Sequence, residues 1–215
     1  MKLETILVGR AIRLLRFTGR PLYMADVVRP LVERYKFLKV PQALEEFDET
    51  KGITFGHGKF TYEGKDVVID SFQVFNNGLI ADTREDTQDA DKFLDDVIEW
   101  GVKELDRVIP VQSVEMLYLS NLEISLKTPL ATYLPVAQQF TGEISRYLTE
   151  YGLKHEPFEM VSFMLNFDRI KLPNSALTNF SIQRREGVPF ESGLYFSSAP
   201  LKTKDHIALL QKIDG

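Results

Sequence analysis

The chain has 215 residues, of which 44% are hydrophobic and 27% are charged, and its formal net charge at pH 7 is −5. This composition excludes a disordered chain and indicates a globular protein, and the length suits one well-buried core rather than two. The lack of cysteine excludes disulfides, thiolate metal sites, iron–sulfur clusters and cysteine nucleophiles. We therefore expect a soluble protein of a reducing compartment, the cytoplasm.

The first residues contain no typical targeting signal. The apolar run around Leu3–Val8 is interrupted by Glu4, is too short to span a membrane and lacks a secretory cleavage site. We therefore expect no transmembrane segment, and the arginine-rich start leaves an organelle transit peptide as the alternative.

In the first half of the chain, residues 3–17 predict either a strand that leads into a helix or a single helix. The spacing of apolar residues predicts a helix over residues 25–37. Residues 52–82 contain short apolar runs separated by Gly and Asn, which predicts a β-meander with hairpin turns at 63–66 and 77–78.

In the middle of the chain, apolar residues at three-four spacing predict a helix over residues 87–107, capped by Asp86 or Thr87. Strict alternation after Pro110 predicts a long antiparallel strand with one wet face. Proline at the start and glycine at the end predict a helix over residues 135–151. Its apolar stripe consists of Val136, Phe140, Ile144, Tyr147, Leu148 and Tyr151.

The last part of the chain predicts strands at 158–172, 178–183 and 194–197, and a helix at 203–213. The element order is then βββ, α, β, α, βββ, α. Because strands come in runs, the order favours an α+β fold with a mainly antiparallel sheet and about four to five helices packed largely on one face. No linker divides the chain, so we expect a single domain over residues 1–215, with residues 1–22 as a basic N-terminal arm.

The sequence contains no complete catalytic motif. Residues Gly52–Phe60 look like a phosphate-binding loop, but the glycine spacing is wrong and Phe60 has no hydroxyl, so a turn between two strands is the better interpretation. A Ser–His pair between Ser197 and His206 would require a coincidence of the fold. The histidines have no metal-binding spacing. We therefore name no catalytic residue, no metal site and no cofactor, and we favour a protein that is not an enzyme.

A ligand pocket between sheet and helices is the second hypothesis for function. Its candidate residues are His57, Asp168, Arg184 and His206. Arg184 shares the inward phase of its strand with Phe180 and Ile182. It should therefore meet a carboxylate or line a pocket, unless the strand has already left the core at that point.

Charge is distributed in blocks. Residues 1–39 carry nine Lys and Arg against three Asp and Glu, residues 40–106 carry six against seventeen, and residues 107–215 carry eleven of each. Opposite blocks favour pairing, within the chain or with a neighbour. Our leading hypothesis is a non-enzymatic protein–protein interaction or assembly protein, acting as a homo-oligomer or as a subunit of a larger complex.

The residues expected to make these contacts are basic Arg10, Arg13, Arg16 and Arg20 and acidic Asp86, Asp89, Asp95 and Asp96. The same four arginines support a third hypothesis, a nucleic-acid accessory factor whose basic arm binds phosphates.

Overall fold

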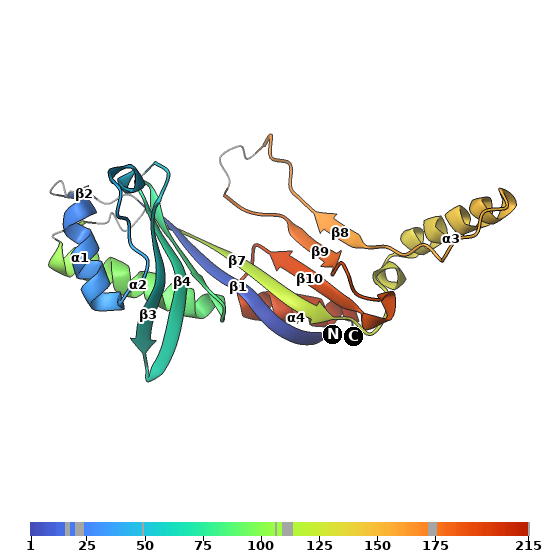
Figure 1. Cartoon of the computed structure of the whole chain (residues 1–215), viewed down its shortest axis with the longest axis horizontal. Coiled ribbons are helices and arrows are strands. Elements are labelled where there is room, and N and C mark those ends of the chain that lie inside the picture. The colour runs from blue at the N-terminus through green and yellow to red at the C-terminus, as the bar shows by residue number, and fades with distance from the viewer. Residues whose placement is uncertain are drawn as a thin grey trace. The chain divides into compact units, whose positions relative to one another are not determined.

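The computed structural model describes residues 1–15, 18–19, 24–48, 50–105, 107–108, 114–171 and 176–214. They form a mixed α+β structure with one eight-stranded antiparallel sheet, in the order β3-β4-β5-β1-β7-β10-β9-β8 (Figure 1). The chain divides into two compact units. Unit 1 comprises Met1–Thr5, Asn121–Ala199 and Asp205–Gly215, and unit 2 comprises Ile6–Ser120 and Pro200–Lys204.

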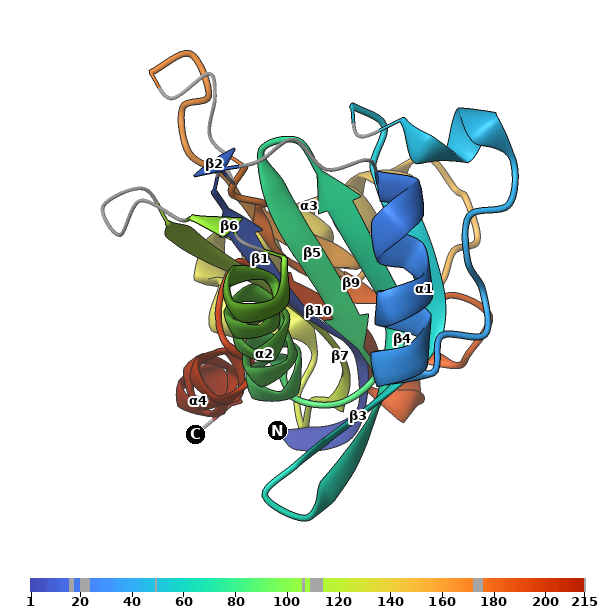
Figure 2. The same ribbon diagram turned by 90° about the vertical axis from the view of Figure 1, so that its left-hand side faces the viewer.

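Unit 2 contains two helices and most of the long strands, and Figure 2 looks onto its helices in front of those strands. Its elements are most of β1 (Lys2–Leu14), β2 (Thr18–Gly19), α1 (Met24–Tyr35), the 3₁₀ turn η1 (Leu44–Phe47), β3 (Ile53–Tyr62), β4 (Lys65–Phe75), β5 (Gly78–Thr83), α2 (Thr87–Glu104), β6 (Arg107–Val108) and the first half of β7 (Glu115–Ser125). Strands β3, β4, β5 and β1 pair in succession, each antiparallel to the next.

The core of unit 2 is built around the ring of Phe93 in α2. This ring is fully buried, and it lies edge-on to Tyr35 at 4.9 Å and to Phe72 at 5.2 Å between ring centroids. Phe37 and Phe60 complete the aromatic cluster. Helix α2 directs Phe93 inward because its apolar residues recur at helical spacing, and the Asp86 side chain caps its first turn by accepting the Gln88 N–H at 2.7 Å.

The prediction of a turn in the glycine-rich segment Gly52–Phe60 is wrong. The residues Ile53–Tyr62 form β3, and the hairpin turn follows this strand at Gly64. The glycines serve close packing instead. A Cβ at Gly58 would lie 2.4 Å from the Phe37 ring, so only glycine leaves room for this aromatic side chain.

Unit 1 contains the second half of β7 and the remaining elements. These are η2 (Leu130–Tyr133), α3 (Pro135–Glu150), β8 (Ser162–Leu165), β9 (Phe180–Arg184), η3 (Phe190–Ser192), β10 (Leu194–Ala199) and α4 (Thr203–Asp214), of which α4 begins in unit 2. Strand β9 pairs antiparallel with both β8 and β10. The unit has a small interior, to which Leu122, Ile124, Ile182, Tyr195 and Leu210 contribute buried side chains.

Most predicted elements are confirmed, with two corrections. Residues 2–14 are a strand, so the single-helix alternative for residues 3–17 is wrong, and the alternative of a strand that leads into a helix is right only in its strand, since no helix begins within residues 3–15. The strand predicted over 158–172 shrinks to Ser162–Leu165, because only these residues pair with β9. The packing of helices largely on one face and the single domain stay predictions.

Among the described residues, the helices are each too short or too polar to cross a lipid bilayer.

Replacing Phe93 with alanine should lower the free energy of unfolding by about 3–5 kcal/mol, because the truncation leaves a cavity in the aromatic cluster. Chemical denaturation followed by circular dichroism measures this change. The matched control is Val68→Ala in β4, whose side chain is exposed and should leave the denaturation midpoint unchanged. Equal effects of the two changes would contradict the placement of the core.

Candidate functional site

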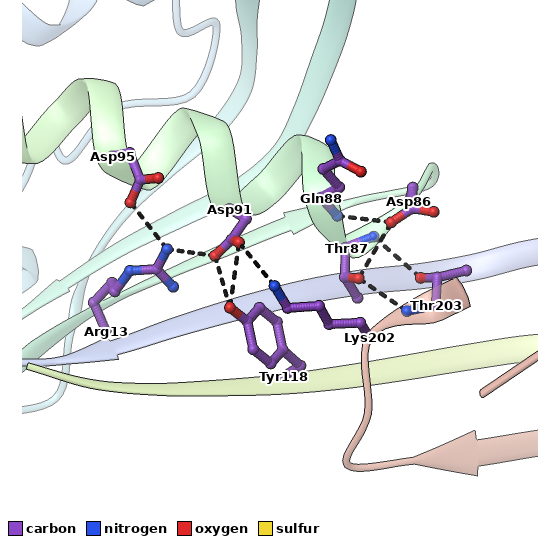
Figure 3. Close-up of polar contacts among 9 residues, drawn as sticks. All are labelled: Arg13, Asp86, Thr87, Gln88, Asp91, Asp95, Tyr118, Lys202 and Thr203. Atoms are coloured by element: carbon purple, nitrogen blue, oxygen red, sulfur yellow. Dashed lines mark hydrogen bonds and ion pairs between the residues drawn. The ribbon is translucent and has the colours of Figure 1, made fainter. Parts of the chain in front are cut away.

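A buried arginine links β1 to α2. The Arg13 side chain lies on the inward phase of β1 between Ala11 and Leu15 and is only 2% exposed. Its Nη2 donates to the Asp91 carboxylate and, at 3.0 Å, to Asp95 (Figure 3). Burial alone lowers the pKa of Arg13, but the two carboxylates more than offset it, so the guanidinium stays charged. A buried cation needs such partners, because removing a charge from water costs several kcal/mol.

The Asp91 carboxylate is shared by several elements. It accepts the Tyr118 hydroxyl from β7 at 3.2 Å, and Lys202 Nζ lies 3.6 Å away. The Lys202 ammonium also lies over the Tyr118 ring, 4.7 Å from its centroid. Figure 3 shows these groups, with Arg13, converging on one turn of α2. This carboxylate therefore fastens β1, β7 and the 200–204 segment to α2.

Two further aspartates of α2 follow the same pattern of one tyrosine and one cation. Asp89 accepts the Tyr62 hydroxyl at 2.7 Å and Lys65 Nζ at 2.8 Å. The hydrogen bond to Asp89 is the main cause that raises the pKa of Tyr62 to about 12, so this hydroxyl keeps its proton and donates it. Asp96 accepts the Tyr35 hydroxyl at 2.6 Å and pairs with Arg34 at 2.9 Å.

The start of α2 is fastened to the start of α4 by two threonines. The backbone N–H of Thr87 donates to the Thr203 hydroxyl at 3.1 Å, and the N–H of Thr203 donates to the Thr87 hydroxyl at 2.9 Å (Figure 3). Both residues are buried. Each threonine thereby satisfies an N–H that would otherwise be unpaired in the first turn of a helix.

The charged residues named from the sequence are used inside unit 2. Arg10 forms a two-pronged ion pair with Asp82 across β1 and β5, at 2.6 and 2.8 Å. Arg13 pairs with the predicted Asp95, whereas Asp86 caps α2. The other two acids, Asp89 and Asp96, bind cations from outside the predicted arm. Arg16 and Arg20 lie outside the described residues.

The four residues predicted to line a ligand pocket lie in different surroundings. His57 is an exposed residue of β3 in unit 2, with a positive φ of 55°. The other three lie in unit 1. Asp168 is exposed and accepts the backbone N–H of Ile170 at 3.0 Å.

Arg184 is buried as its inward phase predicts, but it meets no carboxylate in the described contacts. Its Nη2 donates to the Val188 carbonyl at 2.8 Å, and its guanidinium lies over the Phe190 ring at 3.8 Å. The residue also lines a hollow of about 300 Å³ beside β8 and β9. The arginine therefore supports the loop that follows β9.

The fold brings Ser197 of β10 and His206 of α4 together, as the sequence did not lead us to expect. The serine Oγ lies 2.8 Å from His206 Nε2, and both side chains are buried. A serine nucleophile must reach its substrate, and this hydroxyl is closed off from solvent. Within the described residues, no group of three or more His, Asp or Glu is arranged to hold a metal ion.

The remaining feature is the surface of α3. All sixteen residues of this helix are described, and none of them is buried. Figure 1 shows the helix extending away from the strands of unit 1. Apolar side chains recur along one side at alternating spacings of three and four, and we call this row the α3 seam. It consists of the half-buried Ala137 and the exposed Phe140, Ile144, Tyr147 and Tyr151, and the exposed Val136 lies beside its first residue.

The exposed fractions along the α3 seam are large for apolar residues. Ile144 is 41% exposed, Phe140 64% and Tyr151 68%. The opposite side of the helix is occupied by the chain that follows it, because His155 Nε2 lies 3.1 Å from the Ser145 carbonyl and 3.3 Å from the Thr149 hydroxyl. The seam is therefore an exposed apolar side of α3 that the following chain does not cover.

One flank of the α3 seam is charged and the other is not. Arg146 pairs with Glu143 at 2.7 Å and also with Glu150, so this flank carries one net negative charge. The other flank presents Thr141 and Leu148.

No family model matches the chain, and no curated protein matches it.

Replacing Asp91 with alanine should lower the free energy of unfolding by about 3 kcal/mol, because it leaves the buried Arg13 with a single carboxylate. Urea denaturation measures the change. The control is Arg29→Ala, which removes an ion pair to Glu33 in which both side chains are exposed and should have no measurable effect. If Asp91→Ala proved as harmless as the control, the Arg13 pair would not organise unit 2.

Proposed function

We propose that this chain is a non-enzymatic assembly protein that binds another protein through the α3 seam. The observation that carries the proposal is that a helix with a continuous apolar row has no buried residue. An apolar row of this kind ordinarily faces a core. Leaving it in water costs free energy in proportion to the apolar area, and covering it with a partner recovers that free energy.

The ion pairs within unit 2 favour an apolar docking surface over a charged one. Arg10 and Arg13 of β1 pair with Asp82 of β5 and with Asp91 and Asp95 of α2, and the other ion-paired aspartates of α2, Asp89 and Asp96, pair with Lys65 and Arg34. These residues are therefore already paired within the chain. This weakens the hypothesis of docking through opposite charge blocks, and it weakens the hypothesis that Arg10 and Arg13 bind nucleic-acid phosphates.

The flank of the α3 seam argues for a protein partner instead of a membrane surface. Helices that lie on membranes carry several Lys or Arg beside their apolar side. Here the only cation of α3 is Arg146, and it is paired with Glu143 and Glu150. A net acidic helix would be repelled by anionic lipid headgroups.

The pocket hypothesis has less support. His57 lies in a different unit from the other candidates, and His206 is fully buried against Ser197. Arg184 is held by the loop that it supports. Within unit 1, the side chains of Arg184 and His206 are thus each occupied by contacts with the chain itself.

A photo-cross-linking amino acid placed at position 140 should trap one discrete partner protein in cells that produce the full chain, because Phe140 lies in the middle of the α3 seam. Mass spectrometry of the cross-linked band identifies the partner, and the second change Tyr151→Glu should abolish the band. The matched control places the same amino acid at Thr149, on the opposite side of the helix. The proposal fails if position 140 gives no band, or if both positions give the same bands.

A further inference from the structure

Building on the proposed function, we infer that the partner of the α3 seam is the α3 seam of a second copy of this chain, and that the two helices lie parallel and in register. The inference rests on the spacing of the seam, on the charge of its flanks and on the area that it exposes.

The spacing of the seam points to a helical partner. The steps from Ala137 to Phe140, Ile144, Tyr147 and Tyr151 are three, four, three and four residues. This is the heptad spacing by which two helices pack side chains into each other at a shallow crossing angle. A flat sheet or an extended peptide has no matching period. Helix α3 of a second copy has the same period over the same length.

Charge decides the direction of the pair. In a parallel pair, the acidic flank of one helix faces the uncharged flank of the other, so Glu143 lies near Leu148 of the second copy. In an antiparallel pair, like flanks face each other, and Glu143 would lie near Glu150 of the second copy. Adjacent like charges disfavour pairing. The parallel arrangement avoids this repulsion, and it leaves Arg146 free to keep both of its intrahelical ion pairs.

The exposed area is sufficient for a reversible dimer. With aromatic and aliphatic residues exposed by 41% to 68%, the α3 seam offers roughly 450 Å² of side-chain surface per copy. A standard stable interface covers about 800 Å² per partner, so the seam falls in the range of weak, transient interfaces. We therefore expect a dimer that dissociates on dilution. The neighbouring exposed Leu153 and Phe158 extend the apolar surface beyond the helix.

The lack of cysteine in this chain allows a direct test by disulfide trapping in the purified full-length protein. One variant carries Ala137→Cys and another carries Tyr151→Cys, at opposite ends of the seam. In the parallel pair, each variant forms a disulfide dimer with itself under mild oxidation, because each position faces its own copy. The two positions are about 21 Å apart along the helix, so an antiparallel pair would cross-link only the mixture of the two variants. The control Thr149→Cys, on the side of the helix that faces away from the seam, stays monomeric.

Sedimentation equilibrium provides a second readout that needs no cysteine. The change Phe140→Glu should raise the dimer dissociation constant at least tenfold, whereas Glu143→Gln on the flank should leave it unchanged or lower it. Circular dichroism confirms that both variants are folded. A dissociation constant insensitive to Phe140→Glu would overturn the inference.

The outcomes separate this inference from the proposed function. Disulfide dimers of each variant alone support both. Cross-linking only in the mixture overturns the parallel arrangement. A monomer in every purified sample, together with a different protein trapped at position 140 in cells, overturns the second copy as partner and leaves the proposed function standing. No trapping in either experiment overturns both.

Discussion

The requirement that the buried guanidinium of Arg13 be neutralised organises unit 2. Arg13 sits on the inward phase of β1, and its charge is met by Asp91 and Asp95 from α2. Asp91 in turn accepts Tyr118 of β7 and lies within ion-pair distance of Lys202, so one carboxylate fixes the helix against elements that are far apart in sequence. Because a buried unpaired charge is more costly than most single contacts, the position of α2 is set by this group as well as by the aromatic cluster.

The sequence predicts the secondary structure well, but it predicts less well which residues the side chains contact. Strand and helix periodicities, the Asp86 cap and the hairpin at Gly64 depend on neighbouring residues, so they can be recognised without a fold. The partners of Arg13 are about eighty residues away, and no local pattern shows whether opposite charge blocks meet within one chain or between two. The same limit explains the missed contact between Ser197 and His206, and the interpretation of Gly58 as part of a turn when it makes room for the Phe37 ring.

The apolar stripe of α3 shows a second limit of prediction from sequence. Its spacing is typical of a helix that covers a core, yet the part of unit 1 that the structure describes covers only the other side of the helix, through His155. Hydrophobic periodicity shows that a face should be buried, but it does not show whether the covering surface belongs to the same chain. Because the described charges of unit 2 stabilise its fold and the α3 seam of unit 1 is exposed, we propose that α3 serves assembly and that the ion pairs of α2 serve stability.

The most direct test of this account is the molar mass of the purified chain at low and at high salt, measured by light scattering over a range of concentrations. Docking through the α3 seam predicts a mass that rises with concentration and that stays the same or increases in high salt, because salt screens the weak repulsion between acidic chains and does not weaken apolar contact. Docking through opposite charge blocks predicts the reverse. A mass that falls as salt is added, or that remains at the monomer value at every concentration, would contradict self-association through the α3 seam.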